Sequence, residues 1–136
     1  MNFKPMTDAE IEMANIIPEG TECDAEVVKS EAYVSQSSGK ETIRLILNVF
    51  HGEITNQVYC YLTPNFPFLF KHAIIAMLSD AEYQAGEISP AIFEYKTCRV
   101  VVGLDEYKGR KKNIVMDFKR RPADAAPLPS GDNLPW

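Results

Sequence analysis

The chain has 136 residues, 46% of them hydrophobic, which suits one globular domain with an ordinary core. No run approaches the ~18 apolar residues of a membrane-spanning helix, and the start of the chain lacks the basic-then-apolar order of a secretory signal, so we expect a soluble, cytoplasmic protein. The formal net charge of −5 argues against a polyanionic partner for the chain as a whole.

The charge is, however, unevenly distributed. Residues 1–31 carry eight acidic and two basic side chains, whereas residues 96–121 carry nine basic and three acidic ones, a local charge of +6. Because a polyanion responds to the local field more than to the total charge, one side of the protein can still bind phosphates.

Residues 1–19 are predicted to be an N-terminal extension with one short helical turn, since Thr7 and Glu10 have capping-box spacing and Pro18 breaks the pattern. A first strand begins near Thr21, with apolar residues alternating with acids, and Tyr33–Val34 extends it after a bulge or bend. A turn at residues 35–39 follows.

The second and third strands form a predicted hairpin around His51–Glu53. The run from Ile43 to Val49 has the clearest period-2 alternation in the chain. The third strand separates two faces, which are Ile54, Val58 and Leu62 against Thr55, Gln57, Tyr59 and Tyr61. If the two strands pair, both tyrosines lie beside Arg44.

One helix and two further strands complete the order. A helical stripe between Thr63 and Gly86 is predicted to pack in the core; its members are Phe66, Phe70, Ala73, Ile74, Met77 and Leu78. The fourth strand is predicted over Thr97–Tyr107, with Cys98, Val100, Val102 and Leu104 alternating. The fifth runs over Asn113–Phe118, with Ile114, Met116 and Phe118 alternating, after a hairpin tip at Lys108–Lys112.

This order predicts a mainly β protein with an OB-fold, a five-stranded Greek-key barrel with one helix between strands 3 and 4, over residues 20–121. Another small barrel or sandwich has the same elements and stays open as an alternative. In OB-folds the middle strands and the loops joining strands 1–2 and 4–5 bind oligonucleotides. Here those loops are Ser35–Lys40 and Lys108–Lys112.

Basic and aromatic residues on these parts predict a site for single-stranded DNA, because such sites combine a basic track for phosphates with aromatic rings on which bases stack. The expected phosphate contacts are Arg44, Arg99, Lys108, Arg110, Lys111 and Lys112. The expected stacking residues are Tyr59, Tyr61 and Tyr107, with Tyr33 as a further candidate. Solvated turns and half-buried strand tyrosines explain the same residues without a ligand.

The remaining residues, 122–136, are predicted to be a flexible, Pro-rich tail whose tip binds a partner protein. Asp132, Leu134, Pro135 and Trp136 form an acidic-apolar end. This tip resembles the C-terminal end of bacterial and phage single-stranded-DNA-binding proteins, which recruits replication and repair proteins. It departs from that pattern by having Asn133 in place of a second acid and Trp in place of Phe. A frayed terminus is the alternative.

A second resemblance lies in the last strands. The segment from Lys96 to Gly109, with its Glu-Tyr-x-Gly turn, and the run from Lys112 to Val115 look like the C-terminal strands of a family of small bacteriophage proteins. These proteins are encoded with recombination functions and taken to bind single-stranded DNA. The resemblance covers about residues 20–121 and implies the OB-fold and the DNA role more than particular contacts.

No motif predicts catalysis, a metal or a cofactor. His51 and His72 are isolated in the sequence, and the chain has no Gly-rich phosphate loop or nucleophile elbow. Cys23, Cys60 and Cys98 form no Cys-x-x-Cys pair and are expected to be buried free thiols. We therefore expect a non-catalytic, sequence-independent single-stranded-DNA-binding protein that can form homo-oligomers. The alternatives are an OB-like protein-interaction module without DNA binding and, more distantly, a nuclease.

Overall fold

The computed structural model describes residues 1–34 and 41–128, except for the side chains of Glu12 and Tyr107. The predicted loop at residues 35–40 and the predicted tip at residues 132–136 lie outside the described residues. The elements follow in the order α1 (Asp8–Ala14), β1 (Glu22–Val34), β2 (Glu41–His51), β3 (Ile54–Leu62), α2 (Pro67–Met77), α3 (Asp80–Ala85), β4 (Thr97–Tyr107) and β5 (Arg110–Lys119). No helix in these ranges is long and apolar enough to cross a membrane.

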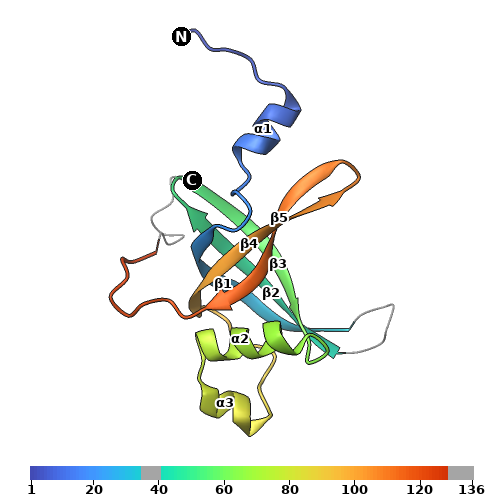
Figure 1. Cartoon of the computed structure of the whole chain (residues 1–136), viewed down its shortest axis with the longest axis vertical. Helices are drawn as coiled ribbons and strands as arrows, with labels where there is room; N and C mark the ends of the chain where they lie inside the picture. Colours follow the sequence, from blue (N-terminus) through green and yellow to red (C-terminus); the bar gives the residue numbers. More distant parts are fainter. Residues whose placement is uncertain (35–40, 129–136) are drawn as a thin grey trace.

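The five strands form one antiparallel sheet in the order β3-β2-β1-β4-β5 (Figure 1). β1 is the central strand, and only its first part pairs with both β2 and β4. β3 and β5 are the two edges, and the described strands include no ladder that joins them. The protein is therefore mainly β with five strands, as predicted, in a sheet that is not closed.

Alternation along the first three strands produces the core. Val27 on β1, Leu47 on β2 and Val58 on β3 are buried, whereas the residues between them face outward, because successive side chains of a strand point to opposite faces. The register of β1 against β2 shifts between Val27 and Lys29, which confirms the predicted bulge and the extension of the strand to Val34.

The β4–β5 hairpin differs from its prediction. The turn has only two residues, Lys108 and Gly109, with φ of 53° and 78°, so β5 begins at Arg110 rather than Asn113. Two positive φ values with Gly second are typical of a type I′ turn, whose twist matches that of paired strands. Arg110, Lys111 and Lys112 are consequently part of a paired ribbon rather than a loop, and Lys108 is in the turn.

The predicted alternation of β5 is wrong before its bulge and right after it. Val115 is buried and Met116 is 58% exposed, because the register shifts opposite Val101–Val102 and leaves Met116 without a partner. Met116 covers Gly103 of β4, where a Cβ atom would lie 2.6 Å from the Met116 Cγ atom. A larger residue at this position would require the Met116 side chain to move. Phe118 beyond the bulge is again buried.

Two helices, rather than the single one predicted, lie between β3 and β4. Ser79 has extended backbone after α2, and its hydroxyl accepts a hydrogen bond from the Glu82 N–H at 3.2 Å, which starts α3. Ser79 and Glu82 have the capping-box spacing that the sequence interpretation missed. Both helices lie at one end of the sheet, opposite α1 (Figure 1).

The predicted core stripe of α2 is confirmed for most of its members. Ala73, Ile74 and Met77 are buried, and Phe70 and Leu78 pack against the core. Phe66 is 67% exposed, so its assignment to the core is wrong. It precedes the helix with non-helical backbone angles, and helical periodicity does not apply to it.

Candidate nucleic-acid interface

A groove of about 350 Å³ lies where the two edges of the sheet approach each other. Its walls come from β3, from β5 and from the segment before β1. It brings together three of the predicted site residues, since Tyr59 lies on one wall and Lys111 and Lys112 on the other. Tyr59 is 49% exposed and both lysines are exposed, so a ring and two cationic groups face solvent at one opening. We call this surface the β3–β5 groove.

Side-chain amides, not a backbone ladder, join the strands below the groove. The buried Asn113 side chain of β5 accepts a hydrogen bond from the Ile17 N–H at 2.9 Å and donates one to the Ile17 carbonyl at 2.8 Å. Asn56 of β3 donates to Asn113 Oδ1 at 3.0 Å and to the Asn15 carbonyl at 2.8 Å. Ile17 itself is fully buried. These hydrogen bonds hold residues 15–17 between β3 and β5, so the floor of the groove is fixed. We call this set of hydrogen bonds the asparagine clamp.

The sequence interpretation missed both asparagines. Asn113 stands at an inward-facing position of a strand, where a polar side chain is unusual and must be hydrogen-bonded. A polar residue at an inward-facing position could have identified Asn113. The prediction missed it because it placed Ile114 and Met116, rather than Asn113 and Val115, on the inner face of β5.

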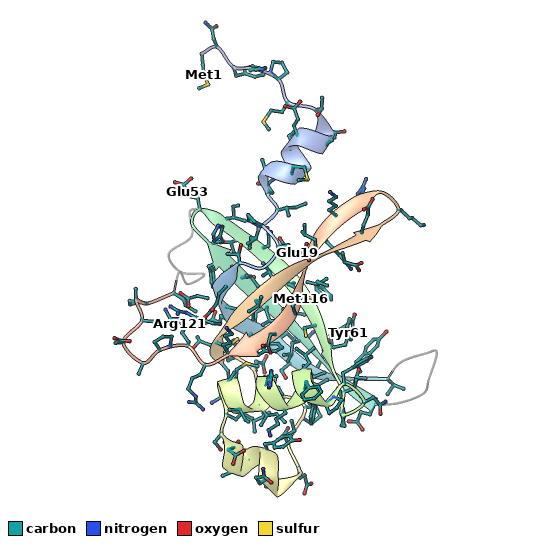
Figure 2. The ribbon with its side chains drawn as sticks, viewed as in Figure 1. Met1, Glu19, Glu53, Tyr61, Met116 and Arg121 are labelled. Atoms are coloured by element: carbon teal, nitrogen blue, oxygen red, sulfur yellow. The ribbon has the colours of Figure 1, made fainter. Side chains whose placement is uncertain are left out.

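A second group of predicted residues lies on the outer face of β1, β2 and β3. Arg44 is opposite Tyr61 in the β2–β3 register, which confirms that one tyrosine lies beside it, while Tyr59 is opposite Ile46. The Tyr33 and Tyr61 rings are 5.3 Å apart between centroids, and the Arg44 guanidinium lies 5.3 Å from the centroid of Tyr33. Figure 2 shows Tyr61 near the α2 end of β3.

Arg44 is already paired with a carboxylate. It donates two hydrogen bonds to Glu31, one of them from Nε at 2.8 Å. The hydrogen bond from Arg44 lowers the pKa of Glu31, and the same bond raises the pKa of Arg44. A phosphate approaching this cluster therefore meets an arginine whose charge is partly offset.

Arg99 lies apart from the other predicted contacts. Its Nε donates to Asp24 Oδ1 at 3.0 Å, on the outer face of β1 and β4. Asp24 and Glu31 are seven residues apart on β1, or roughly 23 Å at ~3.3 Å per residue. The structure therefore does not bring Arg99 together with Arg44 and the tyrosines.

Acids on the outer face of β1 also form ion pairs with other basic residues of the segment 96–121. Lys119 Nζ lies 3.4 Å from Glu22 Oε2, and Arg121 Nε lies 3.2 Å from Asp24 Oδ1, without hydrogen-bond alignment in the latter case. Arg121 also donates to the Ala126 carbonyl, which holds the start of the tail against the protein. The local charge of +6 in the sequence is thus reduced where the strand ends meet β1.

The remaining predicted phosphate contacts are on the β4–β5 ribbon, which projects beyond the rest of the sheet (Figure 1). Lys108, Arg110, Lys111 and Lys112 are all exposed. Asp105 and Glu106 lie opposite Lys112 and Lys111 in the ladder. Tyr107 pairs with Arg110 through the backbone, and its side chain is outside the part of the chain that the structure describes.

The other chemically active side chains form no separate site. His72 Nδ1 lies 2.7 Å from Asp117 Oδ1, a pairing of α2 with β5 that their distance in sequence concealed. Within residues 1–34 and 41–128, no three His, Cys, Asp or Glu side chains are grouped to hold a metal ion. The three cysteines are buried and free, and burial raises the pKa of Cys60 and of Cys98 to about 12, so both thiols stay protonated.

The β3–β5 groove and the group formed by Tyr33, Tyr61 and Arg44 therefore each combine aromatic rings with basic groups. The sequence matches no protein-family model and no curated protein.

Proposed function

We propose that the chain is an OB-fold protein that binds single-stranded DNA with little sequence preference. The observation that carries this proposal is the convergence of Tyr59 with Lys111 and Lys112 on the β3–β5 groove. A stacking ring opposite two cations matches the composition of single-strand sites, where rings hold bases and cations hold phosphates.

The strand order supports the fold part of the proposal. The OB-fold is a partly open five-stranded Greek-key barrel that binds its ligands on strands 2 and 3 and on the loops between strands 1–2 and 4–5. In the order β3-β2-β1-β4-β5 the two edges that such a barrel brings together are β3 and β5, and the amides of Asn56 and Asn113 join them. The aromatic residues lie on β3, and the basic ribbon joins β4 to β5.

In the proposed complex the strand runs from the groove across β3. Lys111 and Lys112, with Lys108 and Arg110 nearer the turn, neutralise phosphates. Bases stack on Tyr59 and then on Tyr61, which lies two residues further on the same face. Neither ring reads a base edge, so little sequence preference is expected.

The test is a salt titration of a fluorescent dT oligonucleotide with the full chain. Since counterions are released from every neutralised phosphate, affinity should fall steeply as salt rises. Duplex DNA of the same length should compete weakly. An affinity that barely changes with salt, or the absence of binding at low salt, would contradict the proposal and favour a protein-interaction module. Incubation of the labelled strand with Mg²⁺ or Mn²⁺ distinguishes a nuclease.

We further propose that Asp132, Leu134, Pro135 and Trp136 recruit a replication or recombination protein. The support is the resemblance of this tip to that of single-stranded-DNA-binding proteins, together with the groove ahead of it. Deletion of residues 132–136 should leave binding to the dT oligonucleotide nearly intact. Loss of binding after the deletion would show that the tip belongs to the DNA-binding domain instead.

A further inference from the structure

A second hollow surface lies at the α2 end of the molecule, away from the β3–β5 groove. Two adjoining pockets of about 340 and 290 Å³ share five lining residues. The shared residues are Pro64, Phe70, Gly86, Glu87 and Ile88. We call the combined surface the α2–α3 groove.

Large apolar side chains and acids surround this groove. Phe66 and Phe68, the chain neighbours of the lining residue Pro67, are 67% and 79% exposed. Apolar patches of this kind on a folded protein mark interaction sites. Three acids, Glu41, Glu82 and Glu87, line the pockets, and Glu41 and Glu87 make no ion pair within the described residues. The groove therefore suits a short apolar segment that carries positive charge.

The N-terminal arm, residues 1–14, has those properties at its beginning. Five of the twelve exposed large apolar side chains of the described residues lie within it: Met1, Phe3, Met6, Ile11 and Met13. Residues 1–6 contain Lys4 and no acid. Thr7 and Glu10 form reciprocal hydrogen bonds that cap the start of α1. The helix therefore lies between residues 1–6 and the asparagine clamp that holds Asn15 and Ile17.

The arm and the groove lie at opposite ends of the molecule. In Figure 1, α1 extends away from the sheet at one end and α2 and α3 lie at the other. The arm is thus directed away from the groove of its own chain and toward solvent, where another molecule can receive it.

We infer that residues 1–6 of one copy dock into the α2–α3 groove of a second copy. Phe3 and Met6 fill the apolar pockets, and Lys4 lies beside Glu87. Because the two surfaces differ, the contact is heterologous and joins copies head to tail, in a ring or an open chain. It uses neither Tyr59 nor the lysines of the β3–β5 groove, so it stands independently of DNA binding.

Cross-linking in solution tests the contact directly. Asn2→Cys in one full-length chain and Ala85→Cys in another, tagged, chain are mixed under mild oxidation; both residues are exposed beside the proposed contact, so Phe3 and Glu87 stay in place. The native thiols are buried, and burial raises the pKa of Cys60 and Cys98 to about 12, so they do not compete. We expect a mixed dimer of distinct mass. The matched control pairs Asn2→Cys with Glu53→Cys, which lies on the β2–β3 turn near the α1 end (Figure 2).

Two results would overturn the inference. One is a yield of mixed dimer no higher than that of the control pair. The other is a chain carrying both Asn2→Cys and Ala85→Cys that closes on itself as a monomer even when diluted, since the arm would then occupy its own groove.

Sedimentation measures the strength of the same contact. The wild-type chain should show concentration-dependent association, and Phe3→Ala should raise its dissociation constant about tenfold or more, the effect of losing one large buried side chain. Lys4→Glu and Glu87→Lys should each weaken association, and mixing the two variants should restore it. A wild-type chain that remains monomeric at all concentrations would refute the inference.

Discussion

The β3–β5 groove and the outer face of β1 and β4 both carry basic residues, but their neighbours differ. At the groove, Lys111 and Lys112 line one wall and Tyr59 the other, and the acids nearest in the ladder, Glu106 and Asp105, come from the same hairpin. On the other face, Arg99 and Arg121 lie within 3.2 Å of the Asp24 carboxylate. The difference teaches that the charge of a sequence segment is not the charge of a surface, because strands distant in sequence bring their own acids.

Arg44 is intermediate between these two regions. It lies beside Tyr33 and Tyr61, as a phosphate contact next to stacking residues should, yet it is bonded to Glu31. The two regions can be separated experimentally by substitutions on each.

The largest expected effect is on stability, from removal of the amide that joins the groove walls. Asn113→Ala leaves the buried N–H and C=O of Ile17 without partners and should lower the free energy of unfolding by about 3 kcal/mol. Urea unfolding measures it. Asn48→Ala, on the outer face of β2, is the control and should change stability little. Equal effects of the two substitutions would show that the Asn113 hydrogen bonds do not stabilise the contact of residues 15–17 with β3 and β5.

A smaller effect, a loss of DNA affinity, is expected when the Tyr59 ring is removed from the β3–β5 groove. Tyr59→Ala should weaken binding of the dT oligonucleotide about tenfold, since one stacking contact contributes ~1–3 kcal/mol. Tyr59→Phe keeps the ring and should bind nearly as the wild type does. If Tyr59→Phe loses as much affinity as Tyr59→Ala, the hydroxyl group rather than stacking contributes to binding, and the proposed contact is wrong.

The groove lysines should change the salt dependence of binding. Removing both with Lys111→Ala and Lys112→Ala should reduce the slope of log K against log salt by about 1.4, at ~0.7 per phosphate on a single strand. Lys96→Ala, an exposed lysine just before β4, is the matched control and should leave the slope unchanged. An unchanged slope in the double variant would remove these lysines from the interface.

On the opposite face, Arg99→Ala should alter DNA affinity by less than about twofold, and stability by at most ~1 kcal/mol, as for other partly exposed ion pairs. Fluorescence titration and urea unfolding measure the two quantities. A loss of affinity comparable to that of the double lysine variant would mean that the DNA path includes β4 and that the two faces are not distinct.

The smallest effect is expected at Glu31. Arg44 lowers the pKa of Glu31 from its ordinary value of 4.5, so the pair stabilises the fold above about pH 4.5 and that contribution is lost as the pH falls through the lowered pKa. Glu31→Gln should remove this part of the acid dependence in unfolding experiments. It should also release Arg44 and strengthen DNA binding slightly. Weaker binding by the variant would mean that Glu31 positions Arg44 for the ligand.

Local patterns predicted most of the strands. β4 has its predicted bounds, and the bulge in β1 was expected from the interruption of alternation before Tyr33. The errors fall where a local pattern is reset by a long-range contact. Met116 is displaced outward over Gly103, and Phe66 precedes its helix, so neither follows the periodicity of its neighbours.

The sequence by itself determined five strands, the aromatic face of β3 and a basic segment near the end of the domain, because alternation and composition are local properties. Only the tertiary structure decided which basic residues meet aromatic rings and which meet acids. It also brought Asn56, Asn113 and Ile17 into one hydrogen-bonded group, from segments up to 96 residues apart. The physical reason is that pairing across strands depends on register and on sheet order, and neither is encoded in any single segment.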